Sequence, residues 1–170
     1  MMAGFHSMMP VTGCLAAEAI SLRYRERRLF ADWTLPLVAL FGVLPDICSP
    51  HISLEDRHDS WSHTLLFLGV LMPVCGMIAW WFEPGKRLRL ACVIWISAML
   101  HLAADAMSGG IPWLLPWSHE TLGSPLDRTY IEPETWIYYD AFFIITAWLG
   151  WRLREKLELR AYERALASGE

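Results

Sequence analysis

The stretch 64–82, TLLFLGVLMPVCGMIAWWF, contains no charged side chain. With the two preceding residues it has 21 residues, and an α-helix of that length is about 31 Å long, enough to cross the hydrocarbon core of a bilayer. A second apolar run covers residues 90–107, in which His101 and Asp105, close to its end, are the only His or charged residues. These two runs predict membrane-spanning helices.

Three weaker apolar runs accompany them, at residues 5–22, 33–45 and 136–151. Each alone could equally be a buried helix of a soluble protein, because short or interrupted apolar runs are ambiguous. Together the five runs predict an all-α fold, a polytopic membrane bundle of about five helices.

The composition also points toward lipid. Of the 170 residues 55% are hydrophobic and ten are Trp, whereas soluble domains average roughly 45–50% apolar residues. The net charge is −4 and no basic groove is evident, so we expect no nucleic-acid partner. The four cysteines form no CxxC pair, and the sequence therefore predicts neither a zinc ribbon nor a disulfide framework.

Basic residues cluster at alternate connections between the apolar runs. Twelve of the fourteen follow the first, third and fifth runs: Arg23, Arg25, Arg27, Arg28, Lys86, Arg87, Arg89, Arg152, Arg154, Lys156, Arg160 and Arg164. Because Lys and Arg mark the cytoplasmic side, this alternation predicts a multi-pass protein of a bacterial-type cytoplasmic (inner) membrane. The N-terminus would lie outside and the C-terminus in the cytoplasm. A soluble helical domain with a very apolar core is the weaker alternative, since it has no need of such alternation.

We expect two parts, a membrane-embedded domain at 1–153 and a cytoplasmic helical tail at 154–170. Near the predicted inner helix ends, Glu18 and Asp32 are expected to snorkel or to pair with the basic cluster at 23–28. No cleavable signal peptide is expected, because the first apolar run lacks a basic segment before it.

The His and Asp residues collect at the opposite, outer ends of the predicted helices. They are His6, Asp46, His58, His63, His101, Asp105 and Asp140. Ionisable groups in membrane helices are costly and usually mark function, and imidazoles with carboxylates are the ligands of divalent transition metals. His101 and Asp105 are four residues apart, so both project from one helical face. The Gly109–Gly110 pair should end that helix and turn the apolar segment 113–115 back over the site.

Four blocks in order carry a family resemblance. They are His6, then LPDI at 44–47, then HDSWSHTLL at 58–66, then HLAAD at 101–105 with GGIPWLLPWS at 109–118. This order resembles the YdjM family of inner-membrane proteins, which are regarded as metal-dependent hydrolases. The resemblance implies a metal site made of His6, Asp46, His58, His63, His101 and Asp105. The His and Pro-Asp order is also similar to that of zinc-dependent phospholipase C, which suggests phosphoester chemistry.

The chain departs from the family pattern at two positions. Cys48 stands where the family usually has a second Asp, and Asp59 stands where it has Arg. Cys48 could bind zinc as a thiolate, or it could be inert while Asp59 or His51 supplies the missing ligand. The pattern therefore leaves open one ion or two.

The sequence thus predicts a hydrolase that uses a divalent metal, with zinc favoured, at the outer leaflet. His63, His101 and Asp105 would hold the ion, Asp46 would bind the same or a second ion, and His58 or Asp59 would act as general acid or base. Residues expected to support the ligands from behind are Cys48, His51 and Asp140. A membrane lipid or lipid-linked phosphoester is the expected substrate. The alternative is a non-catalytic membrane protein in which the ion is structural, sensed or carried.

Overall fold

Five α-helices form from the five apolar runs. The structure, a computed structural model, describes residues 3–50, 58–83, 85–123 and 133–168. Its helices are α1 (Ala3–Arg25), α2 (Thr34–Cys48), α3 (Leu65–Phe82), α4 (Arg87–Met107) and α5 (Pro133–Ser168), and a short 3-10 helix, η2 (Trp61–His63), precedes α3. Within these residues there is no strand, and one isolated bridge joins Ile111 to Leu122. The predicted all-α class is confirmed.

The boundary between η2 and α3 is set by Thr64. Its backbone is extended, and its hydroxyl oxygen accepts a hydrogen bond from the backbone N–H of Phe67 at 3.1 Å. This is the bond of a helix N-cap, which satisfies a donor that the first turn leaves unpaired. The helix consequently begins at Leu65, and His63 lies outside it on the preceding turn.

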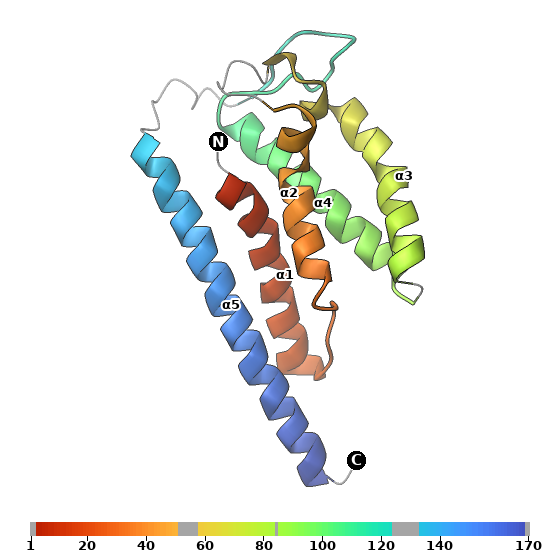
Figure 1. Ribbon diagram of the computed structural model, residues 1–170, viewed down its shortest axis with the longest axis vertical. Coiled ribbons are helices and arrows are strands. Elements are labelled where there is room, and N and C mark those ends of the chain that lie inside the picture. Colours follow the sequence, from red (N-terminus) through yellow and green to blue (C-terminus); the bar gives the residue numbers. More distant parts are fainter. Residues whose placement is uncertain (1–2, 51–57, 84, 124–132, 169–170) are drawn as a thin grey trace.

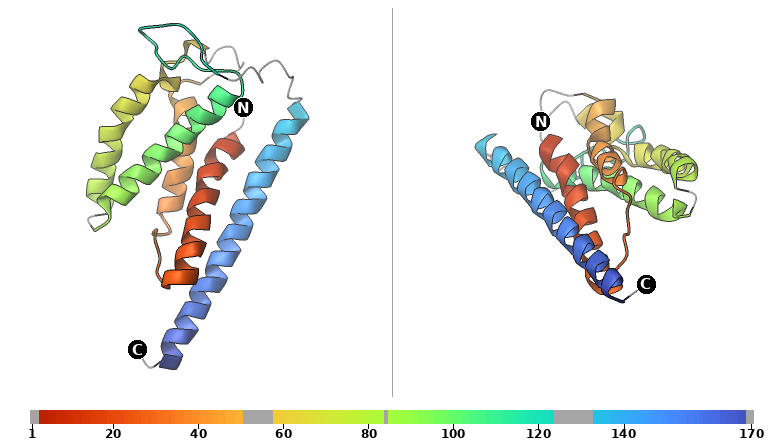
Figure 2. Two further views of the ribbon diagram at one scale, coloured as in Figure 1. Left: turned by 180° about the vertical axis from the view of Figure 1, so that it is seen from behind. Right: turned by 60° about the horizontal axis from the view of Figure 1, so that its bottom comes forward.

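Successive helices run in opposite directions, so that α1, α3 and α5 share one direction and α2 and α4 the other (Figure 1). Helix α1 packs against α5 on one side and α2 on the other, and α4 packs against α2 and α3. Figure 2 shows the same order from behind and from below. The end of α2, the start of α3, the end of α4 and the start of α1 therefore come to one end of the bundle.

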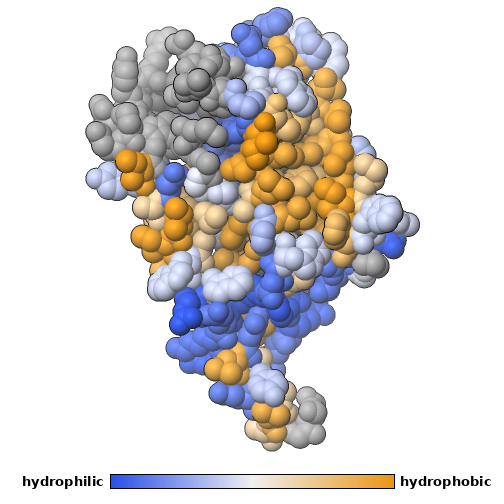
Figure 3. Space-filling model, viewed as in Figure 1, coloured by the Kyte–Doolittle hydropathy of each residue, from blue (hydrophilic) through white to orange (hydrophobic). Residues whose placement is uncertain are grey.

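Helices α3 and α4 are long and apolar enough to cross a membrane, whereas α2, with 15 residues, is shorter. On α3 the side chains of Val70, Met77 and Trp81 are 58–81% exposed, and broad apolar exposure of this kind is typical of a surface that contacts lipid. Figure 3 shows a hydrophobic zone across one face above a hydrophilic zone. Two of the five predicted membrane spans thus have the length and hydropathy needed to cross a bilayer, and the other three remain a prediction.

Helix α5 is the longest element, with 36 residues and a length of about 54 Å. It runs parallel to α1. The two helices approach closely at Gly150, where an added Cβ would lie 3.1 Å from Cβ of Leu15 in α1. The helix continues without interruption past residue 153, so the proposed division into 1–153 and 154–170 stays a prediction.

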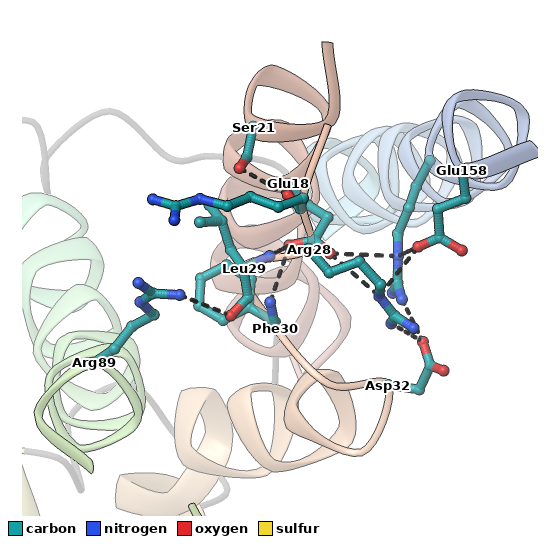
Figure 4. A network of polar contacts seen from close by, with 10 residues as sticks. Glu18, Ser21, Arg28, Leu29, Phe30, Asp32, Arg89 and Glu158 are labelled. Atoms are coloured by element: carbon teal, nitrogen blue, oxygen red, sulfur yellow. Dashed lines mark hydrogen bonds and ion pairs between the residues drawn. The ribbon is translucent and has the colours of Figure 1, made fainter. Parts of the chain in front are cut away.

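A buried polar network joins α1, the α1–α2 connection and α5 at the end of the bundle opposite His6 (Figure 4). Glu18 is 1% exposed, and its Oε2 accepts hydrogen bonds from the backbone N–H groups of Leu29 and Phe30 at 2.8 and 3.0 Å. Its Oε1 lies 3.6 Å from Nε of Arg28 and 3.8 Å from Nε of Arg154. The expected pairing of Glu18 with the basic cluster is therefore present, and α5 adds a second guanidinium.

Arg154 extends this network to further carboxylates. It is 3% exposed, its Nε donates to Glu158 at 2.8 Å, and its guanidinium also pairs with Asp32. Arg89 of α4 donates to the carbonyl of Leu29 at 3.1 Å. The network therefore fixes the α1–α2 connection between three helices.

Arg154→Met tests the network. Removing one partner of a buried ion pair leaves the other charge uncompensated, so we expect the free energy of unfolding to fall by about 3 kcal/mol. Thermal and denaturant unfolding in detergent measure the loss. Arg152→Met, two residues earlier, changes an exposed side chain; it is the control and should change stability by no more than about 0.5 kcal/mol. Equal stability of the two variants would contradict a structural role for the network.

Candidate metal centre

Four potential metal ligands from three elements converge at the end of the bundle where α2 and α4 finish. Asp46 lies in the last turn of α2, His63 on η2, and His101 and Asp105 in the last turns of α4. One ligand atom from each lies within 4.8 Å of the other three, and all four side chains are buried. The structure thus brings together residues that are 59 positions apart in the chain.

The distances between these atoms are nearly equal. Nε2 of His63 lies 3.3 Å from Nε2 of His101, 3.4 Å from Oδ1 of Asp46 and 3.1 Å from Oδ2 of Asp105. Nε2 of His101 lies 3.3 Å from each of the same two carboxylate oxygens. Five separations among the four atoms therefore fall between 3.1 and 3.4 Å.

These separations match the coordination sphere of zinc. Zn–N and Zn–O bonds are about 2.0–2.2 Å long, and atoms at the corners of a tetrahedron about 2.0 Å from its centre are about 3.3 Å apart. Two imidazole nitrogens and two carboxylate oxygens form a donor set that zinc accepts. The residues present consequently fit a divalent transition metal without rearrangement of the backbone.

The burial and location of the two carboxylates favour a cation bound between them. Asp46 is 5% exposed and Asp105 is 4% exposed, and each lies near the C-terminal end of a helix. The helix dipole disfavours negative charge at that end, and burial disfavours it further. A divalent ion bound between the two carboxylates would compensate both costs.

The backbone of α2 sets the orientation of His101. Its Nδ1 lies 2.7 Å from the carbonyl oxygen of Gly42, and because a carbonyl can only accept, Nδ1 carries the proton and donates it. In the neutral ring Nε2 then bears the lone pair, and it faces Asp46 and Asp105. Such a hydrogen bond behind a metal-binding histidine fixes both its tautomer and its direction.

Two serines hold His63 in the same way. Nδ1 of His63 lies 2.8 Å from Oγ of Ser60, and the Oγ atoms of Ser60 and Ser62 are 3.0 Å apart. Ser62 donates to the carbonyl of Pro45 at 2.7 Å, which ties η2 to the last turns of α2. The turn that carries His63 is therefore anchored next to Asp46.

The carboxylates around His63 raise the pKa of its imidazole. Burial lowers the pKa of His63, but hydrogen bonds to Asp105 and Asp46 and the negative charge of Asp105 outweigh burial, so the pKa is raised above its usual value. Protons and a metal ion would compete for the same nitrogen.

His6 reaches this group from the start of α1. Its Nε2 lies 3.4 Å from Oδ1 of Asp105, and its ring packs on that of His101 with centroids 3.9 Å apart. The two oxygens of Asp105 therefore face different imidazoles, Oδ1 toward His6 and Oδ2 toward His63 and His101. His6 can thus position this carboxylate or bind a second ion through it.

Asp140, on α5, acts on His6 through the backbone. Its Oδ1 accepts a hydrogen bond from the N–H of Phe5 at 2.5 Å, in the first turn of α1, where the helix dipole favours a carboxylate. Figure 1 shows the start of α5 beside that of α1.

Three other predicted site residues lie in the described part of the chain but outside the group of four ligand atoms. His58 is half-buried and Asp59 is exposed on the turn before η2, and neither belongs to the group of four ligand atoms. The thiol of Cys48 packs against the hydrophobic core, and it does not belong to the group either. His51 lies outside the described residues. The catalytic roles of His58 and Asp59 therefore stay predictions.

Gly42, Ser60 and Ser62 were not predicted from the sequence to support the site. For Gly42 the signal is its position inside a helix, because glycine there costs about 1 kcal/mol relative to alanine and is used where another segment approaches closely. A Cβ at Gly42 would collide with the carbonyl oxygen of His6 and lie 3.1 Å from Cγ of Pro10. The two serines flank Trp61 within the motif that contains His63.

The segment after α4 turns back toward the site as expected. Gly109 and Gly110 have φ angles of 138° and 84°, which favour glycine, and they end α4. The carbonyl of Trp113 then accepts a hydrogen bond from the N–H of Leu65 at 2.9 Å. The chain from 111 to 113 thus borders the start of α3, two residues from His63.

The fold and this group define an all-helical protein with two candidate membrane spans and a buried group able to bind a metal. A family model described as YdjM inner membrane protein matches residues 1–162, and the chain belongs to this family of inner membrane proteins. The predicted family membership is confirmed. Comparisons with curated proteins and with solved structures gave no match.

Loss of one ligand should abolish metal binding. We expect purified His101→Ala and Asp105→Asn to contain less than about a tenth of the zinc of the unmodified protein, measured by mass spectrometry of the metal, because each variant loses one of the four donors and leaves the other buried polar groups uncompensated. His119→Ala changes an exposed histidine and should retain its zinc. Unchanged zinc content in both ligand variants would eliminate the assignment.

Gly42→Ala tests the contact between α1 and α2. The added methyl group must push α1 away, which displaces His6 and the carbonyl that orients His101, so zinc affinity should fall by about 10-fold or more. Competition with a chelator measures this affinity. Gly69→Ala is the matched control, because a Cβ there meets nothing within 4 Å. If both variants bind zinc equally well, the close approach does not support the site.

Proposed function

We propose that the protein is a membrane-bound metal-dependent hydrolase acting on a lipid or lipid-linked phosphoester. The observation that carries the proposal is the near-tetrahedral group of Asp46, His63, His101 and Asp105, in which five donor separations fit a zinc ion. Membership of an inner membrane protein family supports the lipid environment.

A bound zinc ion would lower the pKa of a water molecule to about 7 and polarise a phosphoryl oxygen. The protein contributes the arrangement around it. The Gly42 carbonyl and the two serines keep the Nε2 atoms of His101 and His63 directed inward. His6 contacts the second oxygen of Asp105 through Nε2, and Nδ1 of His6 is buried with no hydrogen-bond partner among the described residues. A bound substrate could supply that partner, and His6 would then be placed to exchange a proton with it.

An apolar cavity next to the site supports a lipid substrate. It has a volume of about 270 Å³ and is lined by Thr64, which follows His63, and by Trp61, Leu66, Val70 and Leu115 among others. Leu66 and Val70 belong to α3, which is a candidate membrane span. An acyl or prenyl chain in this cavity would bring its phosphoester toward the metal group.

The predicted topology places this end of the bundle at the outer leaflet. Twelve of the fourteen basic residues lie at the end opposite the metal group, in the last turn of α1 and the connection after it, around the start of α4 and in the second half of α5. Basic flanks of membrane helices stay in the cytoplasm. The substrate would then be a lipid of the outer leaflet, and the N-terminus would lie outside.

A structural or carried ion is the competing function, because four protein ligands are enough to close a tetrahedral zinc site. A structural ion leaves no position for water, whereas a catalytic site requires one. The two functions therefore differ in turnover and in the effect of metal removal on stability.

Turnover of lipid esters by metal-depleted and zinc-restored protein tests the proposal. We expect zinc to restore hydrolysis of at least one phospholipid or polyprenyl phosphoester, and His101→Ala to lower that turnover by at least about 100-fold. His119→Ala should keep full turnover. Zinc-loaded protein that hydrolyses none of these esters, but unfolds at a lower temperature once zinc is removed, would establish the structural alternative instead.

A further inference from the structure

A second cavity lies at the end of the bundle opposite the metal group. It has a volume of about 650 Å³ and is formed between the last turn of α1 and the final turns of α5. Its lining residues are Arg23, Arg160, Glu163, Arg164 and Ala167. The volume is within the range of small-molecule sites, roughly 300–1,000 Å³.

The charge of the lining favours an anion. Three guanidinium groups face one carboxylate, that of Glu163. Arg164 pairs with Glu26, whereas the guanidinium groups of Arg23 and Arg160 form no ion pair or hydrogen bond with the rest of the described chain. Two cationic groups from different helices therefore remain able to bind a phosphate, for which Arg is well suited.

The position of the cavity across the proposed membrane matches that of a layer of lipid headgroups. Two ion pairs, Glu18 with Arg154 and Glu26 with Arg164, align α1 and the residue that follows it with α5 along their length. Arg23 lies 17 positions after His6 on α1, a rise of about 26 Å, which is close to the roughly 30 Å of a hydrocarbon core. With the metal group at one membrane surface, Arg23 lies at the other.

Aromatic side chains support this depth. Tyr24 is 80% exposed and Tyr162 is 64% exposed, one on each helix that forms the cavity. Tyrosines are enriched where a membrane protein passes through the headgroup region. A site for a soluble anion alone would have no need of such exposed rings.

We propose that this cavity binds the phosphate of an anionic phospholipid in the leaflet opposite the metal group. The proposal rests on the membrane topology proposed above and is independent of hydrolysis. The phosphate would bridge Arg23 of α1 and Arg160 of α5, which line the same cavity. A lipid so bound would hold the tail of α5 against α1.

The test compares two double variants that each remove two positive charges. Arg23→Gln/Arg160→Gln changes the cavity, and Arg25→Gln/Lys156→Gln is the control, with one exposed cation on each helix outside the lining. Phosphatidylglycerol, phosphatidylcholine or inorganic phosphate is added to detergent-purified protein, and native mass spectrometry and the unfolding temperature report binding. Neither readout needs turnover, so the outcome is separate from that of the hydrolase assay.

We expect phosphatidylglycerol to bind the unmodified protein and raise its unfolding temperature, with little effect of phosphatidylcholine or phosphate. Affinity for phosphatidylglycerol should fall by about 10-fold or more in the cavity variant and by less than about 2-fold in the control. Equal losses in both variants would assign binding to general surface charge and overturn the site. Equal binding of the two lipids would overturn the anionic preference, and equal stabilisation by phosphate would overturn the lipid assignment.

Discussion

Two carboxylates buried together at the negative ends of two helices are the constraint on which the rest of the structure depends. Asp46 and Asp105 are at most 5% exposed, at the C-terminal ends of α2 and α4. Both burial and the helix dipole oppose their charge. The imidazoles of His63 and His101 lie 3.1–3.4 Å from these carboxylates and are the groups nearest to hand to balance their charge. A site of this kind needs rigid support, and the Gly42 carbonyl, the two serines and the Thr64 cap provide it.

The two ends of the molecule have opposite chemistry, and α1 and α5 connect them. At one end α1 contributes His6, and Asp140 of α5 holds the first turn of α1. At the other end Glu18 and Arg154 join the same two helices within a buried network. A shift of α5 along α1 would therefore disturb both ends together. This coupling gives the proposed lipid cavity a structural consequence, since a phosphate between Arg23 and Arg160 would favour one register of the pair.

The sequence predicted the all-α class, and four of the residues that it indicated as metal ligands, Asp46, His63, His101 and Asp105, lie together in the structure. Uncharged runs near the length of a bilayer indicate helices, and His or Asp residues at their ends indicate where the helices meet. The i, i+4 pair of His101 and Asp105 needs only helical periodicity. The contacts that support the site and the bundle could not be predicted, because they depend on packing between segments far apart in the sequence. The Gly42 carbonyl accepts a hydrogen bond from His101, 59 positions away, and Arg154 of α5 forms an ion pair with Glu18 of α1. Cys48 illustrates the limit, because a thiol near Asp46 in the chain packs against the core and not with the ligands.

X-ray absorption at the zinc edge of the purified, zinc-loaded protein tests the central claim most directly, because it reports the atoms around the ion. We expect a first shell of nitrogen and oxygen only, at about 2.0 Å, with the outer scattering of the two imidazoles of His63 and His101. His101→Ala should remove that ordered shell. A sulfur ligand at about 2.3 Å, as Cys48 would supply, or a first shell without imidazole would contradict it.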